Sequence, residues 1–185
     1  MTKNVIAILG LPGSGKTEII NYLMKKLDWP KVYFGEVTFD EMNRLGLEIN
    51  ENNEKITRES LREKFGKLHY AEQVAKKIED AGYENVLVES LYSWQEYLFF
   101  KEKFKEKFIT ISVYSSPKTR YERIGERALR PLSPADAQSR DYAQIENLSQ
   151  AGPIAMADYT IINENDGLEN LHEKVDLVIE SIKIK

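Results

Sequence analysis

The sequence predicts an α/β fold in which a five-stranded, mostly parallel sheet is flanked by helices. Short apolar runs without alternation recur along the chain, as expected of strands that are buried on both faces of a parallel sheet. Amphipathic stretches with apolar residues three and four positions apart lie between these runs and indicate helices. Because strands alternate with helices, the chain should form βαβ units with functional side chains at the carboxyl ends of the strands.

The apolar runs place five strands along the chain. Each run is short and is bounded by glycine, proline or polar residues, which is typical of a buried strand. The predicted strands lie at 5–9, 31–34, 85–89, 108–114 and 159–163.

Periodic apolar positions and capping residues place the helices. Gly82 ends the third helix, and Ser116 followed by Pro117 starts the fifth with an N-cap and a proline in the first turn. A proline-broken segment then separates this helix from the next, whose first turn holds Ser133 or Asp136. The predicted helices span about 19–27, 39–45, 58–80, 94–104, 117–130, 133 onward and 168–182, and 50–55 is expected to be a polar loop.

Length, charge and cysteine content narrow the class of protein. A chain of 185 residues suits one compact domain, expected over 1–185. The net charge of −4 provides no positive field to attract nucleic acid or anionic lipid, so neither is an expected partner. The chain has no cysteine, which excludes disulfides and fits a reducing compartment. The apolar run at 5–9 is far shorter than a membrane span, and no signal-peptide pattern is present. A cytoplasmic monomer or weak dimer is therefore expected.

The segment 10–17 reads GLPGSGKT and fits the phosphate-loop (Walker A) pattern G-x-x-x-x-G-K-[ST] completely. Gly13 and Gly15 let the backbone turn with its N–H groups facing inward, and the following helix adds its free N–H groups to the same anion site. Lys16 can reach the β- and γ-phosphates of a nucleotide, and Thr17 can hold Mg²⁺. The residues expected to contact ATP here are Gly10, Pro12, Gly13, Ser14, Gly15, Lys16, Thr17 and Glu18.

Several protein classes share this loop, and other features of the chain favour a kinase. GTPases usually carry an N-K-x-D element, whereas the nearest segment here, 163–166, lacks the lysine. Motor-type ATPases generally need a longer chain and a strand that ends in adjacent acids.

Two acids follow predicted strands, at the edge where a parallel sheet places its active site. Glu36 follows the second strand and Glu89 closes the third. A carboxylate in this position can accept the proton of a substrate or hold a water on Mg²⁺. His69 and His172 are isolated in the sequence, so we interpret them as ordinary helix residues and expect no metal cluster.

Four arginines recur at helical spacing in the second half of the chain, namely Arg120, Arg123, Arg127 and Arg130. On a regular helix they share one face, which would be positive although the protein is acidic. A phosphoryl-transfer enzyme needs such cations to offset the charge of the transferring group. We expect Arg123 and Arg127 to contact ATP and take part in catalysis, whereas Arg120 is explained equally well by an ion pair on the helix.

The order of these motifs resembles that of the adenylate-kinase-related P-loop kinases, and most closely a poorly characterised branch that is similar to dephospho-coenzyme A kinase. The resemblance covers nearly the whole chain. It rests on the phosphate loop, Gly35-Glu36, Glu89-Ser90, Ser116-Pro117 with Arg120, Arg123 and Arg127, and Ala157-Asp158-Tyr159 with Ile161 and Asn163.

The resemblance implies a nucleoside-monophosphate-kinase-like fold that uses Mg²⁺–ATP as donor. It further implies a helical substrate-binding region at about 36–70 and an arginine-bearing helical lid at about 120–140. Arg140-Asp141 resembles an Arg-Asp pair that follows the lid in this branch. Arg140, and Arg62 in the helical region, are therefore candidates for binding an acceptor phosphate.

Two aromatic residues depart from the family pattern. Nucleoside monophosphate kinases usually have an arginine where this chain has Phe39, and the branch tends to have one where this chain has Tyr92. An acceptor with a ring to stack, or with a hydroxyl in place of a phosphate, is then expected. Tyr92 should face that acceptor, whereas core packing accounts for its aromatic neighbours Trp94, Tyr97, Phe99 and Phe100.

These observations lead to one main hypothesis and two alternatives. The main hypothesis is a Mg²⁺- and ATP-dependent kinase for a nucleotide-, nucleoside- or coenzyme-like acceptor, with Glu36 orienting or deprotonating the acceptor. In this scheme Thr17 and, through water, Glu89 hold Mg²⁺. One alternative is a nucleotide-gated binding protein with weak ATPase activity. The other is a kinase for a modified base in DNA, against which the acidic charge balance counts.

Overall fold

A computed structural model describes residues 3–128, 131–164 and 166–182 and confirms the five-stranded parallel sheet. The strand order is β2-β3-β1-β4-β5, and every neighbouring pair is parallel. All five predicted strands are present within one residue of their expected limits. Their bounds are β1 Asn4–Leu9, β2 Lys31–Tyr33, β3 Asn85–Glu89, β4 Phe108–Tyr114 and β5 Tyr159–Ile162.

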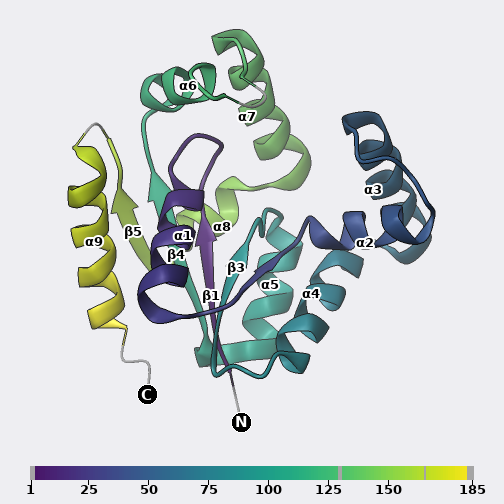
Figure 1. Ribbon diagram of the computed structural model, residues 1–185, viewed down its shortest axis with the longest axis horizontal. Helices are drawn as coiled ribbons and strands as arrows, with labels where there is room; N and C mark the ends of the chain where they lie inside the picture. The colour runs from purple at the N-terminus through teal and green to yellow at the C-terminus, as the bar shows by residue number, and fades with distance from the viewer. Residues whose placement is uncertain (1–2, 129–130, 165, 183–185) are drawn as a thin grey trace.

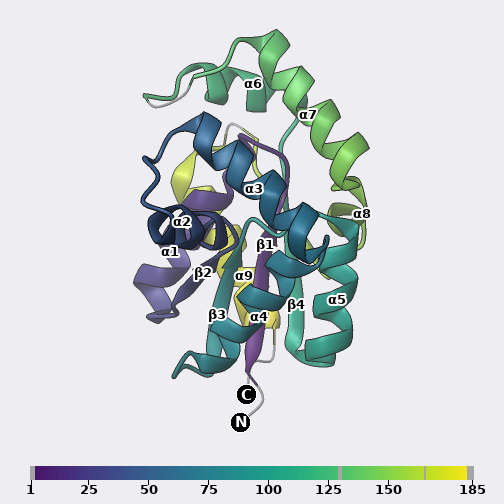
Figure 2. The ribbon, with the colours of Figure 1, turned by 90° about the vertical axis from the view of Figure 1, so that its right-hand side faces the viewer.

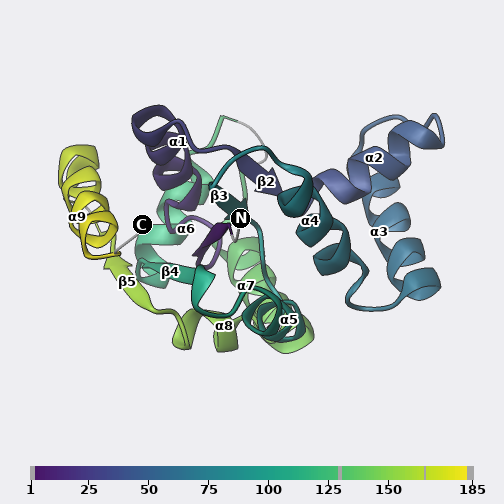
Figure 3. The same ribbon diagram turned by 90° about the horizontal axis from the view of Figure 1, so that it is seen from below.

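Helices cover both faces of the sheet, with α1 and α9 on one face and α4 and α5 on the other (Figures 1 and 3). Helices α6 and α7 lie beyond the carboxyl ends of the strands, and α2 and α3 project to one side (Figures 1 and 2). The helices are α1 Lys16–Leu27, α2 Glu36–Arg44, α3 Glu51–Phe65, α4 His69–Asp80, α5 Trp94–Phe104, η1 Lys105–Lys107, α6 Pro117–Gly125, α7 Pro134–Leu148, α8 Ala151–Ala155 and α9 Gly167–Ser181.

The central strand β1 contributes to two separate cores. Val5, Ala7 and Leu9 pack on the α4–α5 side, whereas Ile6 and Ile8 pack on the α1–α9 side. This division follows from the two-residue period of a strand, which sends successive side chains to opposite faces. Because both faces are covered, the strand is apolar without alternation, as its sequence indicated. Trp94, Tyr97, Phe99 and Phe100 pack in the α4–α5 core as expected.

The polar segment 50–55 is helical, so the expectation of a loop there was wrong. Asn50 caps α3, and its side chain accepts a hydrogen bond of 2.9 Å from the backbone N–H of Asn53. Helix α3 lies largely exposed, so its first turns lack the apolar stripe that marks a packed helix. The single helix expected over 58–80 is two helices, separated at Gly66, where φ is +89°. The short helix α8 was not predicted.

The arginines expected to share one helix face do not all lie on one helix. Helix α6 ends at Gly125, so Arg120 and Arg123 are helical, whereas Arg127 lies beyond the helix. Glycine is a poor helix former, which explains the early end. Arg130 lies outside the described residues, and the closing motion of a lid at 120–140 stays a prediction. Within the described ranges, no helix combines the length and apolar composition required to cross a membrane.

A buried ion pair joins α6 to α7. Arg120 Nη2 lies 2.7 Å from Asp141 Oδ2, and both side chains are only 4% exposed. Arg120 Nη1 also donates to Asp141 Oδ1 at 3.0 Å, and the hydroxyl of Tyr121 donates to Asp141 Oδ2 at 3.0 Å. Charged groups at this depth are tolerated because each is paired and hydrogen-bonded. Arg120 is therefore a structural arginine, in agreement with the ion-pair interpretation.

We predict that Asp141→Ala lowers the free energy of unfolding by about 3–5 kcal/mol, because it leaves the Arg120 guanidinium buried without a partner. Chemical denaturation followed by circular dichroism measures the change. Glu146→Ala is the matched control, since Glu146 is exposed on the same helix and the expected change is within about 0.5 kcal/mol. Equal stability of the two variants would contradict the structural role of the pair.

Candidate active site

The phosphate loop connects β1 to α1 and has three glycines at positive φ, namely Gly10, Gly13 and Gly15 at +143°, +82° and +102°. A Cβ atom at Gly13 would lie 2.6 Å from the carbonyl oxygen of Arg120, and one at Gly15 would collide with the side-chain amide of Asn163. Both glycines are thus required by close packing behind the loop as well as by the turn itself.

Three side chains bind the loop's carbonyl oxygens from behind; we call them the loop donors. Gln150 Nε2 donates to the carbonyl of Gly10 at 3.1 Å, Arg120 Nη1 to that of Pro12 at 3.2 Å, and Asn163 Nδ2 to that of Ser14 at 2.8 Å. In a trans peptide the C=O and the next N–H point in opposite directions. When the carbonyl oxygen of a peptide unit is held on the outer side of the loop, the N–H of the same unit points toward the cavity. There it can donate a hydrogen bond to a phosphate.

A cavity of about 380 Å³ opens in front of the loop; we call it the phosphate-loop cavity. Its lining combines the loop with side chains from the strand ends and from the α6–α7 region. The lining residues are Pro12, Gly13, Gly15, Lys16, Thr17, Tyr33, Glu89, Ser90, Tyr92, Arg123, Arg127 and Arg140.

Lys16 has an unusual protonation equilibrium in this cavity. Burial and, next in size, the nearby Arg127 together lower the pKa of Lys16 to about 8, whereas Glu89 acts in the opposite direction. Its Nζ donates to the carbonyl of Leu11 at 3.1 Å. The Lys16 amine is therefore partly desolvated, and a bound polyanion would favour its charged form.

The cavity also offers oxygen ligands that fit Mg²⁺. The Thr17 hydroxyl and the Glu89 carboxylate line the same space, and Glu89 lies 2.8 Å from Lys31 Nζ. Mg²⁺ is commonly held by one or two protein oxygens together with waters and substrate phosphates, which matches this pair. In the described part of the chain, no three His, Cys, Asp or Glu side chains gather into a metal site made of protein ligands alone.

A second cavity of about 400 Å³ adjoins the first and shares Gly15 and Arg123 with it. We call it the rear cavity. Glu18, Leu168 and Leu171 also line it, so its surface is partly apolar. Glu18 Oε1 lies 3.1 Å from His172 Nε2, which places Glu18 beside the nucleotide region as expected.

The two lid arginines occupy different positions. Arg123 Nη1 donates to Ser115 Oγ and to the carbonyl of Asn163, both at 3.1 Å, and its Nη2 donates to the carbonyl of Glu164. Arg123 therefore holds the loop after β5 and lies between the two cavities, both of which it lines. Its expected contact with ATP stays a prediction. Arg127 is exposed and lines the phosphate-loop cavity, and no partner binds it among the described residues.

Glu36 is not part of this site, which corrects the expectation of a catalytic acid. It begins α2, and its carboxylate lies 3.1 Å from Lys77 Nζ on α4, which also pairs with Asp40 at 2.7 Å. A carboxylate in the first turn of a helix is favourable, and the lysine turns it away from the sheet edge. Glu36 is absent from the described lining of the phosphate-loop cavity.

Phe39 and Tyr92, the two aromatic residues that depart from the family pattern, lie in different places. Phe39 packs against Tyr33 with ring centroids 6.4 Å apart and lines none of the cavities described above, so it does not face an acceptor there. Tyr92 lines the phosphate-loop cavity, and its hydroxyl donates to Ser90 Oγ at 2.8 Å. Burial raises the pKa of Tyr92. Ser90 has φ +69°, a strained conformation of the kind that gathers at functional sites.

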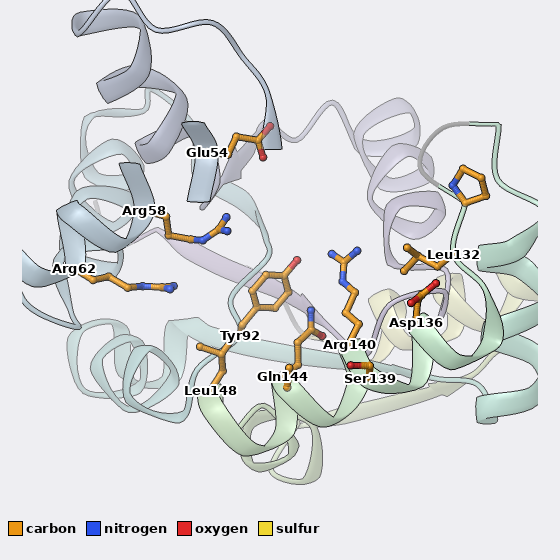
Figure 4. A pocket seen from close by; sticks show the side chains of 12 residues that line it. Glu54, Arg58, Arg62, Tyr92, Leu132, Asp136, Ser139, Arg140, Gln144 and Leu148 are labelled. Atoms are coloured by element: carbon orange, nitrogen blue, oxygen red, sulfur yellow. The ribbon is translucent and has the colours of Figure 1, made fainter. Parts of the chain in front are cut away.

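A third and larger cavity of about 770 Å³ lies between α3 and α7; we call it the interhelical cavity. Helix α3 lines it with Glu54, Arg58 and Arg62, which are four residues apart and so share one helix face. Figure 4 shows Tyr92 between this face and Arg140 of α7. Tyr92 and Arg140 line both this cavity and the phosphate-loop cavity, so the two spaces adjoin each other at these side chains.

Arg62 and Arg140 both line this cavity, and their role in binding an acceptor phosphate stays a prediction. Arg58 was not among the expected site residues. Its spacing of four from Arg62 is the signal that could have identified it, because both arginines lie within the helix predicted from 58 and so share one face.

The comparisons with known proteins agree with this architecture. The AAA domain family matches residues 6–147. A UPF0200 protein of Thermococcus sibiricus is 31% identical over 98% of this chain and 96% of its own length. The chain belongs to the AAA domain family and to the UPF0200 proteins. These names specify neither a substrate nor an acceptor, and the likeness to dephospho-coenzyme A kinase stays a prediction.

Two solved structures share the fold at low identity. The shikimate kinase of Acinetobacter baumannii, in complex with shikimate, has a TM-score of 0.60 and 20% identity over 100% of this chain and 97% of its own. A gluconokinase of Sinorhizobium meliloti has a TM-score of 0.59 and 14% identity over 97% and 98% of the two chains. At these identities the likeness establishes a P-loop kinase-like fold.

The lowered pKa of Lys16 predicts that nucleotide binding takes up a proton. At pH 8 about half of the Lys16 side chains are neutral, and the phosphates of ATP favour the charged form, so about 0.5 proton is taken up per nucleotide. The uptake should vanish near pH 6, where Lys16 is already charged. Calorimetry in two buffers of different ionisation enthalpy measures it, with Lys16→Met as control. Buffer-independent heats for the wild type at pH 8 would contradict the prediction.

Proposed function

We propose that the protein is an ATP- and Mg²⁺-dependent kinase that transfers a phosphoryl group to a small-molecule acceptor. The junction of two cavities carries this proposal. A complete phosphate loop opens on one side, and the interhelical cavity meets it at Tyr92 and Arg140. A protein that only binds or hydrolyses a nucleotide needs the first space, whereas a kinase needs both.

On the donor side, the chain's residues suit a purine nucleotide. The loop amides and Lys16 would bind the phosphates, while Thr17 and, through water, Glu89 would hold Mg²⁺. The rear cavity, with Leu168 and Leu171 on one wall, would receive the base. Arg123, held by the loop after β5, would separate the base from the phosphates.

The transfer itself depends on positioning and charge. The acceptor oxygen bonds to the γ-phosphorus as the bond to the β–γ bridging oxygen breaks, and ADP leaves with that electron pair. The proton of an acceptor hydroxyl would pass to water or to an oxygen of the transferring phosphoryl group. Lys16 and Arg127 would offset the negative charge on the oxygens around the γ-phosphorus. Tyr92 and Arg140, at the junction of the cavities, would orient the acceptor so that its oxygen lies in line with the leaving group.

One observation favours the alternative of a nucleotide-gated protein with weak ATPase activity. Among the described residues that line the phosphate-loop cavity, the only carboxylate is that of Glu89, because Glu36 pairs with Lys77. A site with one acid has no separate base for an alcohol acceptor. A screen of ATP consumption with nucleosides, nucleotides, dephospho-coenzyme A and hydroxy acids distinguishes the two functions. Consumption that rises with one acceptor supports the kinase, and consumption that no acceptor changes supports the alternative.

We predict that Lys16→Ala reduces acceptor-dependent ATP consumption by at least about 10²-fold and leaves the melting temperature unchanged or higher. Activity falls because the charge that faces the phosphates is lost. Stability is kept because burial penalises this charge in the free protein. Lys25→Ala, an exposed position on the same helix, is the control and should behave as wild type. Undiminished turnover in Lys16→Ala would disprove the phosphate-loop assignment.

We predict that Arg127→Ala lowers kcat by about 10²-fold while ATP affinity changes only a few-fold, since this exposed side chain should act mainly in the transition state. Steady-state kinetics with the best acceptor and a separate ATP-binding titration measure the two effects. Arg44→Ala, on an exposed arginine that pairs with Glu41, serves as control. An effect confined to KM for ATP would make Arg127 a ground-state contact instead.

A further inference from the structure

We infer that the interhelical cavity binds the acceptor by an anionic group, a phosphate or a carboxylate, and that Arg58 and Arg62 of α3 hold this group. The inference rests on the proposed kinase function and specifies the chemical class of its acceptor. It favours an anionic group over the expected hydroxyl in place of a phosphate, an expectation that rested on Phe39 and Tyr92 standing where related kinases have arginines.

The first support is that both guanidinium groups lack a protein anion. Arg58 and Arg62 are half-buried, and in the part of the chain that the structure describes neither forms an ion pair. Arg44 and Arg120, in contrast, pair with Glu41 and Asp141. Partly desolvated charges facing a cavity are stabilised when a ligand supplies the opposite charge.

The second support is geometric. Residues four apart on a helix have Cβ atoms about 5–6 Å from each other, so the two arginines can bind the same phosphate or carboxylate. Figure 4 shows both side chains extending from α3 into the cavity toward Tyr92. The guanidinium carbon of Arg62 also lies over the ring of Tyr70, 5.2 Å from its centroid, in a cation–π contact.

The third support is a small pocket of about 90 Å³ that branches from the larger space. It shares Arg58, Arg62 and Tyr92 with the interhelical cavity, and Tyr33, Tyr70 and Glu96 also line it. The Glu96 carboxyl accepts hydrogen bonds from the backbone N–H groups of Tyr92 and Ser93, and burial raises its pKa. Both arginines thus face a confined recess whose one described acid is engaged in the cap of α5, which suits a small anionic group. The volume of about 770 Å³ beyond it accommodates an organic molecule of nucleotide size.

The two acids of the interhelical cavity do not remove this positive character. Asp136 lies in the first turn of α7, where its carboxylate accepts a hydrogen bond of 2.6 Å from Oγ of the N-cap residue Ser133. Glu54 also lines the cavity, on the α3 face, one turn from Arg58. Arg140 adds a third guanidinium from the opposite helix, so the described lining has three cations and two anions.

Titration of the protein with inorganic phosphate tests the inference directly. The phosphate loop is first saturated with Mg²⁺ and a non-hydrolysable ATP analogue, so that phosphate reports on the remaining anion sites. Phosphate should bind the wild type, and Arg58→Ala and Arg62→Ala should each weaken binding by roughly tenfold, as expected for a charge-assisted hydrogen bond. Calorimetry gives the affinities, and thermal unfolding shows whether each variant is folded.

Lys55→Ala is the matched control. Lys55 is exposed on α3 and is not part of the described lining of any of these cavities, so its removal tests the effect of net charge alone. The control should bind phosphate as the wild type does. Absence of phosphate binding in the wild type, or equal binding by the Arg58→Ala/Arg62→Ala double variant, overturns the inference.

Paired organic probes distinguish the two sources of the anion. AMP is compared with adenosine, and shikimate with its methyl ester, each in the nucleotide-saturated protein. Preference for AMP assigns a phosphate group, preference for shikimate assigns a carboxylate, and equal binding of the neutral partner in both pairs counts against the inference. Failure of the proposed function has a different signature, because the ATP analogue would then not bind or ATP consumption would not depend on any acceptor.

Discussion

The phosphate loop depends on three hydrogen bonds made to its outer side. The loop donors Arg120, Gln150 and Asn163 belong to segments far apart in the sequence, and each binds one loop carbonyl. Because the peptide units are trans, these contacts determine where the amides point. The anion site is therefore built by α6, the start of α8 and the end of β5 as much as by the glycine-rich motif.

Arg120, one of the three loop donors, also connects the phosphate loop to helix α7. Arg120 binds the carbonyl of Pro12 and at the same time forms the buried pair with Asp141 on α7. The residue before Asp141 is Arg140, which lines both the phosphate-loop and the interhelical cavities. A shift of α7 would strain the buried pair, so Arg120 links the position of α7 to the phosphate loop.

The electrostatics of the site differ from those of the whole chain. The protein is acidic, with a net charge of −4, yet Lys16, Arg127 and Arg140 line one cavity with a single described acid, Glu89. Burial first, and then the neighbouring Arg127, lower the pKa of Lys16, which shows the cost of holding its charge here. A bound polyanion would relieve that cost, which gives the site affinity for phosphates without a globally positive surface.

The sequence by itself determined the strands, most helices and the phosphate loop, because apolar period and glycine spacing are local properties. It also placed Lys16, Thr17 and Glu89 at one edge, since parallel strands end together. Only the tertiary structure decided the partners of side chains. Glu36 forms an ion pair with Lys77, 41 residues away, and Arg120 forms a buried ion pair with Asp141. Helix α3 brings Arg58 opposite α7, because docking of helices is a non-local outcome that no periodicity encodes.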